Sequence, residues 1–191
     1  MVRAGRILVV CTGNVCRSPY IERRLQHELV GSGIEVTSAG THALVGHDMD
    51  AGTRILLQAS GTDVAGFTAR DLTVDLLAAA DLVVAAAREH RAAAARLYPS
   101  AMRRTFTLRD LADLLSGVTA ADLDAGVSGL PWVRQVADAA SRRRSAVPAR
   151  QHGIDVTDPI RGPPSRFQQM AAEVDDALAP VVQVLRQGPA I

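Results

Sequence analysis

The sequence contains no lysine, so all 21 of its strongly basic residues are arginines. A chain without lysine cannot form the internal Schiff base of a pyridoxal enzyme, and it cannot supply the lysine with which a nucleotide-binding P-loop holds phosphate. Both classes of enzyme are therefore excluded. Because 20 acidic residues balance the arginines, the formal net charge is only +1, and we expect no nucleic-acid partner.

Aromatic residues and cysteines are also scarce. Aromatic residues make up 3% of the chain, which leaves little material for stacking bases or sugars, and we expect an aliphatic core. The only cysteines are Cys11 and Cys16, too few for a tetrahedral zinc site on their own or for the disulfides of a secreted scaffold. We therefore expect no metal, no other cofactor and a reducing, cytoplasmic setting.

Long apolar runs are missing as well. The uninterrupted apolar run before Cys11 has only four residues, 7–10, which is too few for a signal peptide or a membrane-spanning helix. We expect a soluble protein with no membrane partner. With 48% hydrophobic residues, a chain of 191 residues buries roughly 70% of the surface that it exposes when unfolded. The sequence therefore predicts a single domain over 1–191.

Short apolar runs alternate with helical patterns along the chain. Short apolar runs predict two buried strands, at 7–10 and 82–86, and two further strands are predicted at 34–38 and 103–108. Four helices are predicted between these strands, at 18–30, through the 50s to near Gly61, at 71–79 and at 89–97. This alternation predicts an α/β fold in three layers, a parallel sheet with helices on both faces.

Between 109 and 155 the pattern changes, and no strand is predicted there. Leucines recur at helical spacing, Thr119–Asp122 resembles a capping box, and Pro131 is placed to open another helix. We interpret this stretch as an extra helical insert in the domain. The apolar residues at 167–185 then predict a final core helix that contains Pro180.

The insert is locally basic. Residues 134–150 contain five arginines and one aspartate, a local charge of +4. The simpler interpretation is a solvated helix end that runs into a loop. The alternative is that an acidic partner docks at Arg142–Arg144.

The segment 11–18, of sequence CTGNVCRS, connects the first predicted strand to the first predicted helix. Backbone N–H groups at such a junction point toward the space above the helix N-terminus, which favours the binding of an anion. The helix dipole and Arg17 favour the thiolate form of Cys11, and Arg17 can donate two parallel hydrogen bonds to an oxyanion. Gly13 and Asn14 permit the backbone conformations that turn the amides inward.

This segment, with Val10 before it and Pro19 after it, resembles the signature of the low-molecular-weight protein tyrosine phosphatase family. The C-x5-R loop of that family forms a phosphocysteine intermediate. The resemblance implies that Cys11 attacks phosphorus, that Arg17 holds the phosphoryl oxygens and that Ser18 assists departure of the thiolate. It also implies a metal-free phosphomonoester hydrolase on a four-stranded, flavodoxin-like core. The resemblance also implies that the loop residues contact the phosphoryl oxygens, namely Thr12, Gly13, Asn14, Val15 and Cys16.

The same family uses an acid in an Asp-Pro pair, and Asp158-Pro159 matches it. The resemblance implies that Asp158 protonates the leaving oxygen and later activates water, and Asp155 is the nearby competitor. The run that begins at Ser38, Ser-Ala-Gly-Thr, also resembles the family, where this serine holds the loop asparagine. The resemblance covers roughly 6–108 and 155–186, and it implies no function for the segment between.

The sequence departs from the family where phosphotyrosine-specific members carry aromatic walls. Leu44, Ile160 and Arg161 stand in those places, which removes about 1 kcal/mol per stacking contact. The substrate is therefore either a phosphorylated protein or a small phosphate ester. Phe67 stands where the family often has a histidine that braces the loop. Val15 disfavours the phosphoarginine branch, which has threonine at that position.

Three other functions stay open. A thiol-dependent arsenate reductase on the same fold needs only Cys11, although the thioredoxin-coupled version needs further cysteines that 82–90 lacks. A small-metabolite phosphatase and a catalytically silent phosphate-binding module are the others.

Cys16 can form a reversible disulfide with Cys11 that protects Cys11 from overoxidation. The histidines show no metal-binding spacing and are expected at the surface or as helix caps, and Glu22 is expected to be a capping or salt-bridging group.

Overall fold

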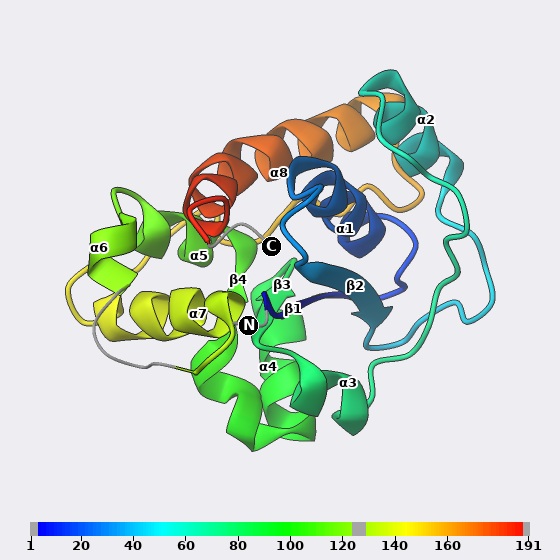
Figure 1. The fold of residues 1–191 in the computed structure, drawn as a ribbon. Helices are drawn as coiled ribbons and strands as arrows, with labels where there is room; N and C mark the ends of the chain where they lie inside the picture. The colour runs from blue at the N-terminus through cyan, green and yellow to red at the C-terminus, as the bar shows by residue number, and fades with distance from the viewer. Residues whose placement is uncertain (1–3, 124–128, 189–191) are drawn as a thin grey trace.

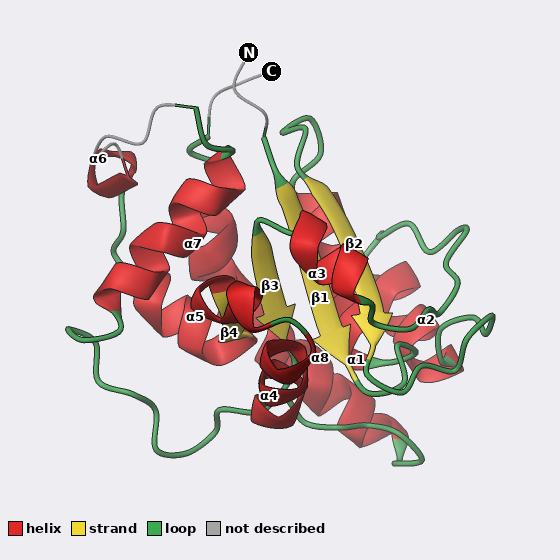
Figure 2. Ribbon diagram, turned by 90° about the horizontal axis from the view of Figure 1, so that it is seen from below, coloured by secondary structure: helices red, strands yellow, loops and turns green. Residues whose placement is uncertain are grey.

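The computed structural model describes residues 4–123 and 129–188, and every structural statement below refers to these residues. Its centre is a parallel sheet of four strands in the order β2-β1-β3-β4 (Figure 2). The strands are β1 (Arg6–Cys11), β2 (Glu35–Gly40), β3 (Leu82–Ala85) and β4 (Thr105–Thr107). The predicted three-layer, flavodoxin-like α/β fold is confirmed.

Helices cover both faces of this sheet, as Figure 1 shows with α1 and α8 above it and α3 and α4 below. The described helices are α1 (Arg17–Glu28), α2 (Ala51–Ala59), α3 (Val74–Ala79), α4 (Arg88–Leu97), α5 (Leu108–Leu115), α6 (Ala120–Leu123), α7 (Trp132–Arg143) and α8 (Pro164–Leu185), with a 3-10 helix at Pro99–Arg104. Within β1, Ile7 and Val9 face the larger core and Leu8 and Val10 face the smaller one. Burial on both faces explains why this strand is apolar throughout.

The sheet order places the end of β1 at a switch point. In the ladder, Val10 pairs with Ala39 of β2 on one side and with Ala85 of β3 on the other. The chain therefore leaves β1 toward β2 and later returns to the opposite side of β1, which opens a crevice at the carboxyl end of the strand. Cys11 is the last residue of β1 and lies at this crevice.

Two predicted elements are shorter than expected, the fourth strand and the helix at 71–79. The fourth strand is shorter than 103–108, because Arg104 belongs to the 3-10 helix and donates hydrogen bonds to the carbonyls of Leu77 and Ala80. At its other end, the hydroxyl of Thr107 accepts from the N–H of Asp110 and caps α5, so Leu108 is already helical. The predicted helix over 71–79 begins only at Val74, where the Thr73 side chain caps it.

The predicted insert contains α5, α6 and α7 and, over its described residues, no strand. Helix α7 begins after Pro131, as expected. Val133 and Val136 of α7 are fully buried in the same core as Ile7 of the sheet, and α5 packs against α8. This shared core supports the proposal that the insert and the sheet form one domain.

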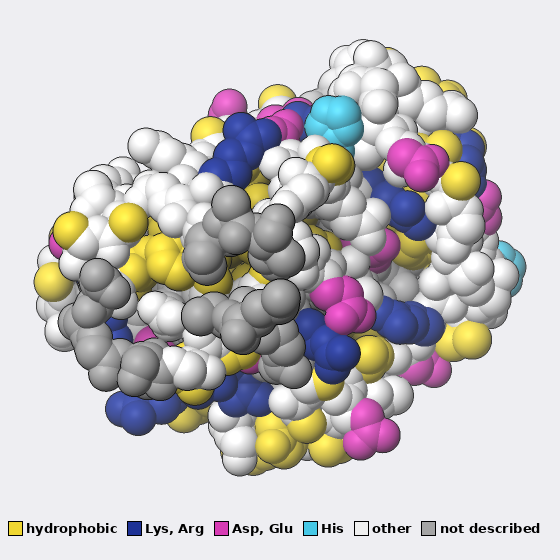
Figure 3. Space-filling view, viewed as in Figure 1, with side chains coloured by type: hydrophobic (Ala, Val, Ile, Leu, Met, Phe, Trp, Pro, Cys, Tyr) yellow, Lys and Arg dark blue, Asp and Glu magenta, His cyan; other side chains and the backbone are white. Residues whose placement is uncertain are grey.

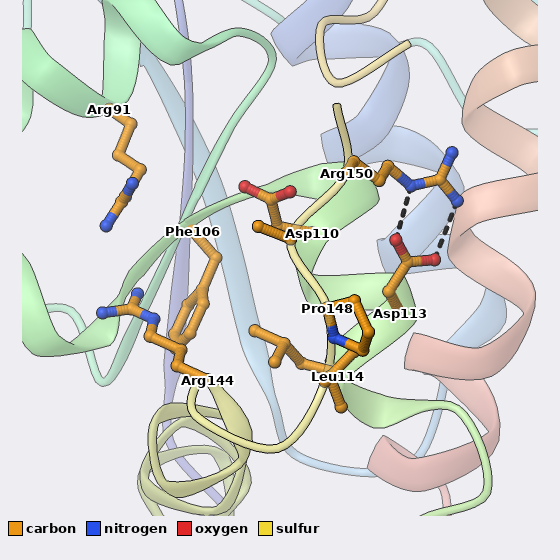
Figure 4. Close-up of a pocket in the computed structure, with 10 residues that line it drawn as sticks. Arg91, Phe106, Asp110, Asp113, Leu114, Arg144, Pro148 and Arg150 are labelled. Carbon is orange, nitrogen blue, oxygen red and sulfur yellow. Dashed lines mark hydrogen bonds and ion pairs between the residues drawn. The ribbon is translucent and has the colours of Figure 1, made fainter. Parts of the chain in front are cut away.

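The arginines at the end of the insert are largely engaged within the protein. Arg144 donates to the carbonyl of Thr105 over 2.8 Å and lies over the ring of Phe106, while Arg143 donates to the carbonyl of Ser116. Arg91 of α4 donates to the same Thr105 carbonyl, so the two guanidinium groups cover the edge strand β4. Figure 4 shows Arg91 and Arg144 beside Phe106 in a cavity of about 240 Å³. Of Arg142–Arg144, only Arg142 is exposed to solvent, as we expected for the whole helix end.

Candidate active site

In the loop between β1 and α1, the backbone carbonyls are hydrogen-bonded to the protein and the backbone N–H groups are not. The carbonyls of Cys11, Thr12, Gly13, Val15 and Cys16 all accept hydrogen bonds, for example from Thr41 N–H and Leu44 N–H. In the described part of the chain, no N–H of residues 12–16 donates to another protein group. Because buried or half-buried amides are nearly always paired, this row of free donors indicates a site built for an anion.

The left-handed residue of the loop is Asn14, which has φ +54°. Gly13 does not have a positive φ, and an added Cβ there would meet only Val15 at 3.5 Å. The role expected of Gly13 in the turn therefore does not use a positive φ and stays a prediction, while the left-handed conformation expected of Asn14 is confirmed. The Asn14 side chain is fully buried and holds the conformation, because its Oδ1 accepts from the N–H of Arg70 over 2.9 Å.

A chain of hydrogen bonds runs from the buried carboxylate of Glu22 to the sulfur of Cys11. Asn14 Nδ2 donates to Ser38 Oγ over 2.7 Å and to Ser18 Oγ over 2.8 Å, and Ser18 Oγ lies 2.9 Å from Cys11 Sγ. Ser38 in turn donates to Glu22 Oε2. The predicted contact between Ser38 and the loop asparagine is confirmed, and Glu22 closes the chain.

The two ends of this chain fix the direction of its protons. The N–H of Arg70 orients the amide of Asn14, so both amide protons face the serines. A carboxylate only accepts, so Ser38 must donate to Glu22. Ser18 then accepts from Asn14, and its own proton is free for Cys11 Sγ. Burial raises the pKa of Glu22, and the hydrogen bond from Ser38 opposes that rise.

Arg17 and Asp158 meet although they are 141 positions apart, with Arg17 Nη2 lying 2.7 Å from Asp158 Oδ2. The Arg17 side chain is 6% exposed and that of Asp158 is 44% exposed, so a buried cation meets a half-exposed carboxylate. The competitor Asp155 pairs with Arg88 instead. The structure therefore brings Asp158, and not Asp155, to the loop arginine.

The side chains of Val15 and Cys16 point into the core, with exposed fractions of 7% and 4%. Only their backbone can contact a bound anion. Burial, followed by the charge of Asp50, raises the pKa of the Cys16 thiol to about 12, so this group stays protonated at neutral pH. Both cysteines are free thiols, and the disulfide between them stays a prediction.

The three expected wall positions are exposed, and two of them, Leu44 and Ile160, are apolar. Leu44 is 49% exposed and is anchored to the loop, because its N–H donates to the carbonyl of Gly13. Ile160 is 43% exposed, and Arg161 follows it with φ +57°, a strained value for a residue other than glycine. Phe67 packs in the core under Arg23.

Sequence reasoning missed two residues of the site, Glu22 and His90. Glu22 is one helical turn after Ser18, a spacing that places both on the same face of α1 and could have revealed it. His90 is 1% exposed, and its Nε2 lies 2.8 Å from Thr12 Oγ1. The expectation that every histidine is a surface or capping residue was wrong for His90. Among the described residues, no cluster has the composition of a metal site, and no helix is long and apolar enough to cross a membrane.

Comparison with known proteins identifies the family of this chain. Residues 6–125 match the family model "Low molecular weight phosphotyrosine protein phosphatase". The chain belongs to this family. The low molecular weight protein-tyrosine-phosphatase Etp of Escherichia coli K12 is 40% identical over 104 residues, which are 54% of this chain and 69% of Etp. A protein-arginine-phosphatase of Geobacillus stearothermophilus is 32% identical over 120 residues, which are 59% of this chain and 80% of that protein.

Solved structures extend the likeness beyond the family match. Vibrio vulnificus Wzb in complex with benzylphosphonate superposes with a TM-score of 0.67 at 25% identity, over 94% of this chain and 97% of Wzb. The low-molecular-weight phosphatase family works through a cysteine nucleophile, and this chain is a cysteine phosphatase of that kind. The matches do not favour an arsenate reductase.

Proposed function

We propose that this phosphatase hydrolyses phosphotyrosine in proteins, with Cys11 as nucleophile, Arg17 and the amides of residues 12–16 as the phosphoryl site, and Asp158 as general acid and base. The free amides around Cys11 are the observation that carries this proposal. They form a site for the oxygens of a transferring phosphoryl group without any metal. We also propose a cytoplasmic setting, which suits two cysteines that remain free thiols.

In the first step, Cys11 Sγ attacks phosphorus while the bond from phosphorus to the tyrosine oxygen breaks. The proton of Asp158 passes to that oxygen, so tyrosine leaves neutral. Arg17 exchanges its contact with Asp158 for the phosphoryl oxygens, which accept its hydrogen bonds in pairs.

In the second step, water attacks the phosphocysteine, and Asp158, now a carboxylate, takes the proton of the water. The bond from sulfur to phosphorus breaks, and inorganic phosphate and the Cys11 thiolate are released. The hydroxyl of Ser18 donates to the departing sulfur. The hydrogen-bond chain from Glu22 orients this hydroxyl toward the sulfur.

Phosphotyrosine is favoured over phosphoarginine by two features of the open rim. Leu44 and Ile160 offer exposed apolar surface, which suits a ring better than a charged guanidinium. Arg161, three residues after Asp158, is exposed and cationic and disfavours a substrate that carries a guanidinium next to the phosphate. Without aromatic walls, a small phosphate ester remains the competing substrate.

The test measures phosphate release, in a chelator and without added metal, from four substrates. These are an aryl phosphate, a phosphotyrosine peptide, a phosphoarginine peptide and a set of sugar and nucleotide phosphates. We expect the phosphotyrosine peptide to be turned over best, and Cys11→Ser to abolish turnover while vanadate still raises its melting temperature. Preference for a sugar or nucleotide phosphate would replace the proposed substrate. Vanadate binding without turnover by the wild type would indicate the silent module.

A further inference from the structure

His90 is buried against the catalytic loop, and the proposed mechanism does not use it. It lies in the first turn of α4, which begins just after β3 ends, so it stands at the same sheet edge as Cys11. Its Nε2 is 2.8 Å from Thr12 Oγ1 and 3.3 Å from Glu89 Oε1. Its Nδ1 is buried and has no hydrogen-bond partner in the described chain.

The surroundings of His90 keep its ring neutral. Burial and then the charge of Arg17 lower the pKa of His90 to about 4, although Asp158 and Asp155 oppose the shift. From pH 5 to pH 8 the ring therefore carries one N–H, on either Nε2 or Nδ1.

The contacts of the two ring nitrogens decide which one carries the proton. Nε2 faces the Glu89 carboxylate, which can only accept, and an unprotonated Nε2 would place a lone pair against that charge. A proton on Nδ1 would also bury an N–H without an acceptor. Nε2–H is therefore the donor, and Thr12 Oγ1 accepts from it.

This assignment leaves the hydroxyl proton of Thr12 without a protein acceptor among the described residues. Thr12 follows the nucleophile directly, and it is only partly buried, unlike Val15 and Cys16. Its backbone is fixed on the other side, because its carbonyl accepts from the N–H of His42 over 3.0 Å. A fixed hydroxyl with a free proton at this place can donate to a bound oxyanion.

We propose that His90 is a positioning residue, which holds Thr12 through Nε2–H so that the Thr12 hydroxyl donates a hydrogen bond to the phosphoryl group on Cys11. The proposal rests on the proposed function of the Cys11 site. It assigns Thr12 a side-chain contact with substrate in addition to its backbone N–H. It also explains a buried histidine that no core contact requires, because an apolar residue of similar volume would fill the same space without an unpaired nitrogen.

Kinetics of paired variants test the coupling between the two residues. We expect His90→Leu and Thr12→Val each to lower kcat/KM for an aryl phosphate by about tenfold to 100-fold, the effect of one lost hydrogen bond to a charged group. The double variant should lose no more than either single one, because both remove the same contact. His90→Gln, whose amide N–H can replace Nε2–H, should recover most of the rate. His27→Leu, an exposed histidine at the far end of α1, is the matched control and should retain the wild-type rate.

The overturning kinetic result is multiplicative loss in the double variant, or wild-type kcat/KM for folded His90→Leu. Two-bond ¹H–¹⁵N spectra of the His90 ring give a readout that does not need turnover. We expect a neutral ring protonated at Nε2 from pH 5 to pH 8. An Nδ1–H ring, or titration near pH 6.5, overturns the proposal even if the enzyme is active. If Cys11→Ser and wild type are equally inactive, the proposed function fails, and the spectra still decide the state of His90.

Discussion

The guanidinium of Arg17 can bind either Asp158 or a phosphoryl group. Arg17 is held by Asp158 at 2.7 Å in the free protein, and the phosphoryl group needs the same donors. Because the Asp158 carboxylate is 44% exposed, water screens this ion pair and the pair contributes little to stability. The buried Arg17 therefore keeps its position while Asp158 is free to turn toward the leaving oxygen. The ion pair is best understood as a resting state of the catalytic acid.

Asp158→Ala should separate catalysis from anion binding. Loss of the acid should lower kcat for a phosphotyrosine peptide by about 10²- to 10⁴-fold. Inorganic phosphate should inhibit more strongly than in the wild type, because Arg17 no longer has a competing carboxylate. Steady-state kinetics with phosphate as the inhibitor measure both effects. Asp155→Ala, which removes the hydrogen bonds and the ion pair to Arg88 and leaves Arg17 and Asp158 in place, is the control. Weaker inhibition of Asp158→Ala by phosphate would contradict the exchange of partners at Arg17.

At this scale, sequence predicted the residues that belong to a recognised motif, including the distant Asp158 and Ser38, and missed Glu22 and His90, which belong to none. Cys11, Arg17 and Ser18 follow one another closely, so their chemistry is visible in the pattern. Thr12 and His90 are 78 positions apart, and a histidine in an alanine-rich helix gives no sign of which loop it will meet. The one available signal was its place just after a buried strand, since carboxyl ends of parallel strands share an edge of the sheet.

Helix α2 connects the catalytic loop to the last helix. The N–H of Asp50, its N-cap, donates to the carbonyl of Val15 over 2.8 Å, so the start of α2 is tied to the loop. Two residues later, Gly52 lies against the ring of Phe167 from α8, where an added Cβ would be 2.7 to 2.9 Å from ring carbons. A displacement of α2 from α8 would therefore move the loop as well.

Gly52→Ala should destabilise the protein, although alanine normally stabilises a helix by about 1 kcal/mol relative to glycine. The overlap with Phe167 should reverse the sign and lower the free energy of unfolding by about 1 to 3 kcal/mol. Urea denaturation measures this change. We also expect kcat/KM to fall, because a displaced α2 would move Asp50 and with it the catalytic loop. Adding Phe167→Leu, which removes the ring, should recover part of the loss. A more stable Gly52→Ala would show that α2 does not depend on this contact.

Elements were predicted in kind and order because hydrophobic periodicity is local, and their ends were predicted less well because polar contacts set them. The hydroxyl of Thr107 ends β4 by capping the next helix, and Thr73 delays the start of α3. Such caps compete with the apolar pattern, which continues through both boundaries. The insert was predicted to be helical, but the amphipathic pattern of α7 could not indicate which surface would cover its apolar face.

In the whole molecule, the insert and the catalytic fold share one core. Val133 and Val136 of α7 are as fully buried as Val9 of the central strand. The indole N–H of Trp132 donates to the carbonyl of Leu185 over 3.0 Å and joins α7 to α8, which follows the Asp158 loop. These contacts bury apolar surface on both partners, so separating the insert would expose the core of the sheet. We therefore expect the proposed single domain to unfold as a unit.

Trp132 is the only tryptophan of the chain and lies at the start of α7 in the insert, so its fluorescence reports the surroundings of α7, including the contact with α8. Far-UV circular dichroism reports all helices, and reaction of Cys11 with a thiol reagent reports the loop. In urea, all three probes should give coincident transitions, as two-state unfolding of one domain requires. Vanadate at about 100 times its Kd should stabilise the native state by about 2.7 kcal/mol and shift all three transitions together. Trp132→Phe provides the fluorescence blank. If the insert is a separate module, tryptophan fluorescence will change at its own urea concentration and will not respond to vanadate, which binds only at the loop.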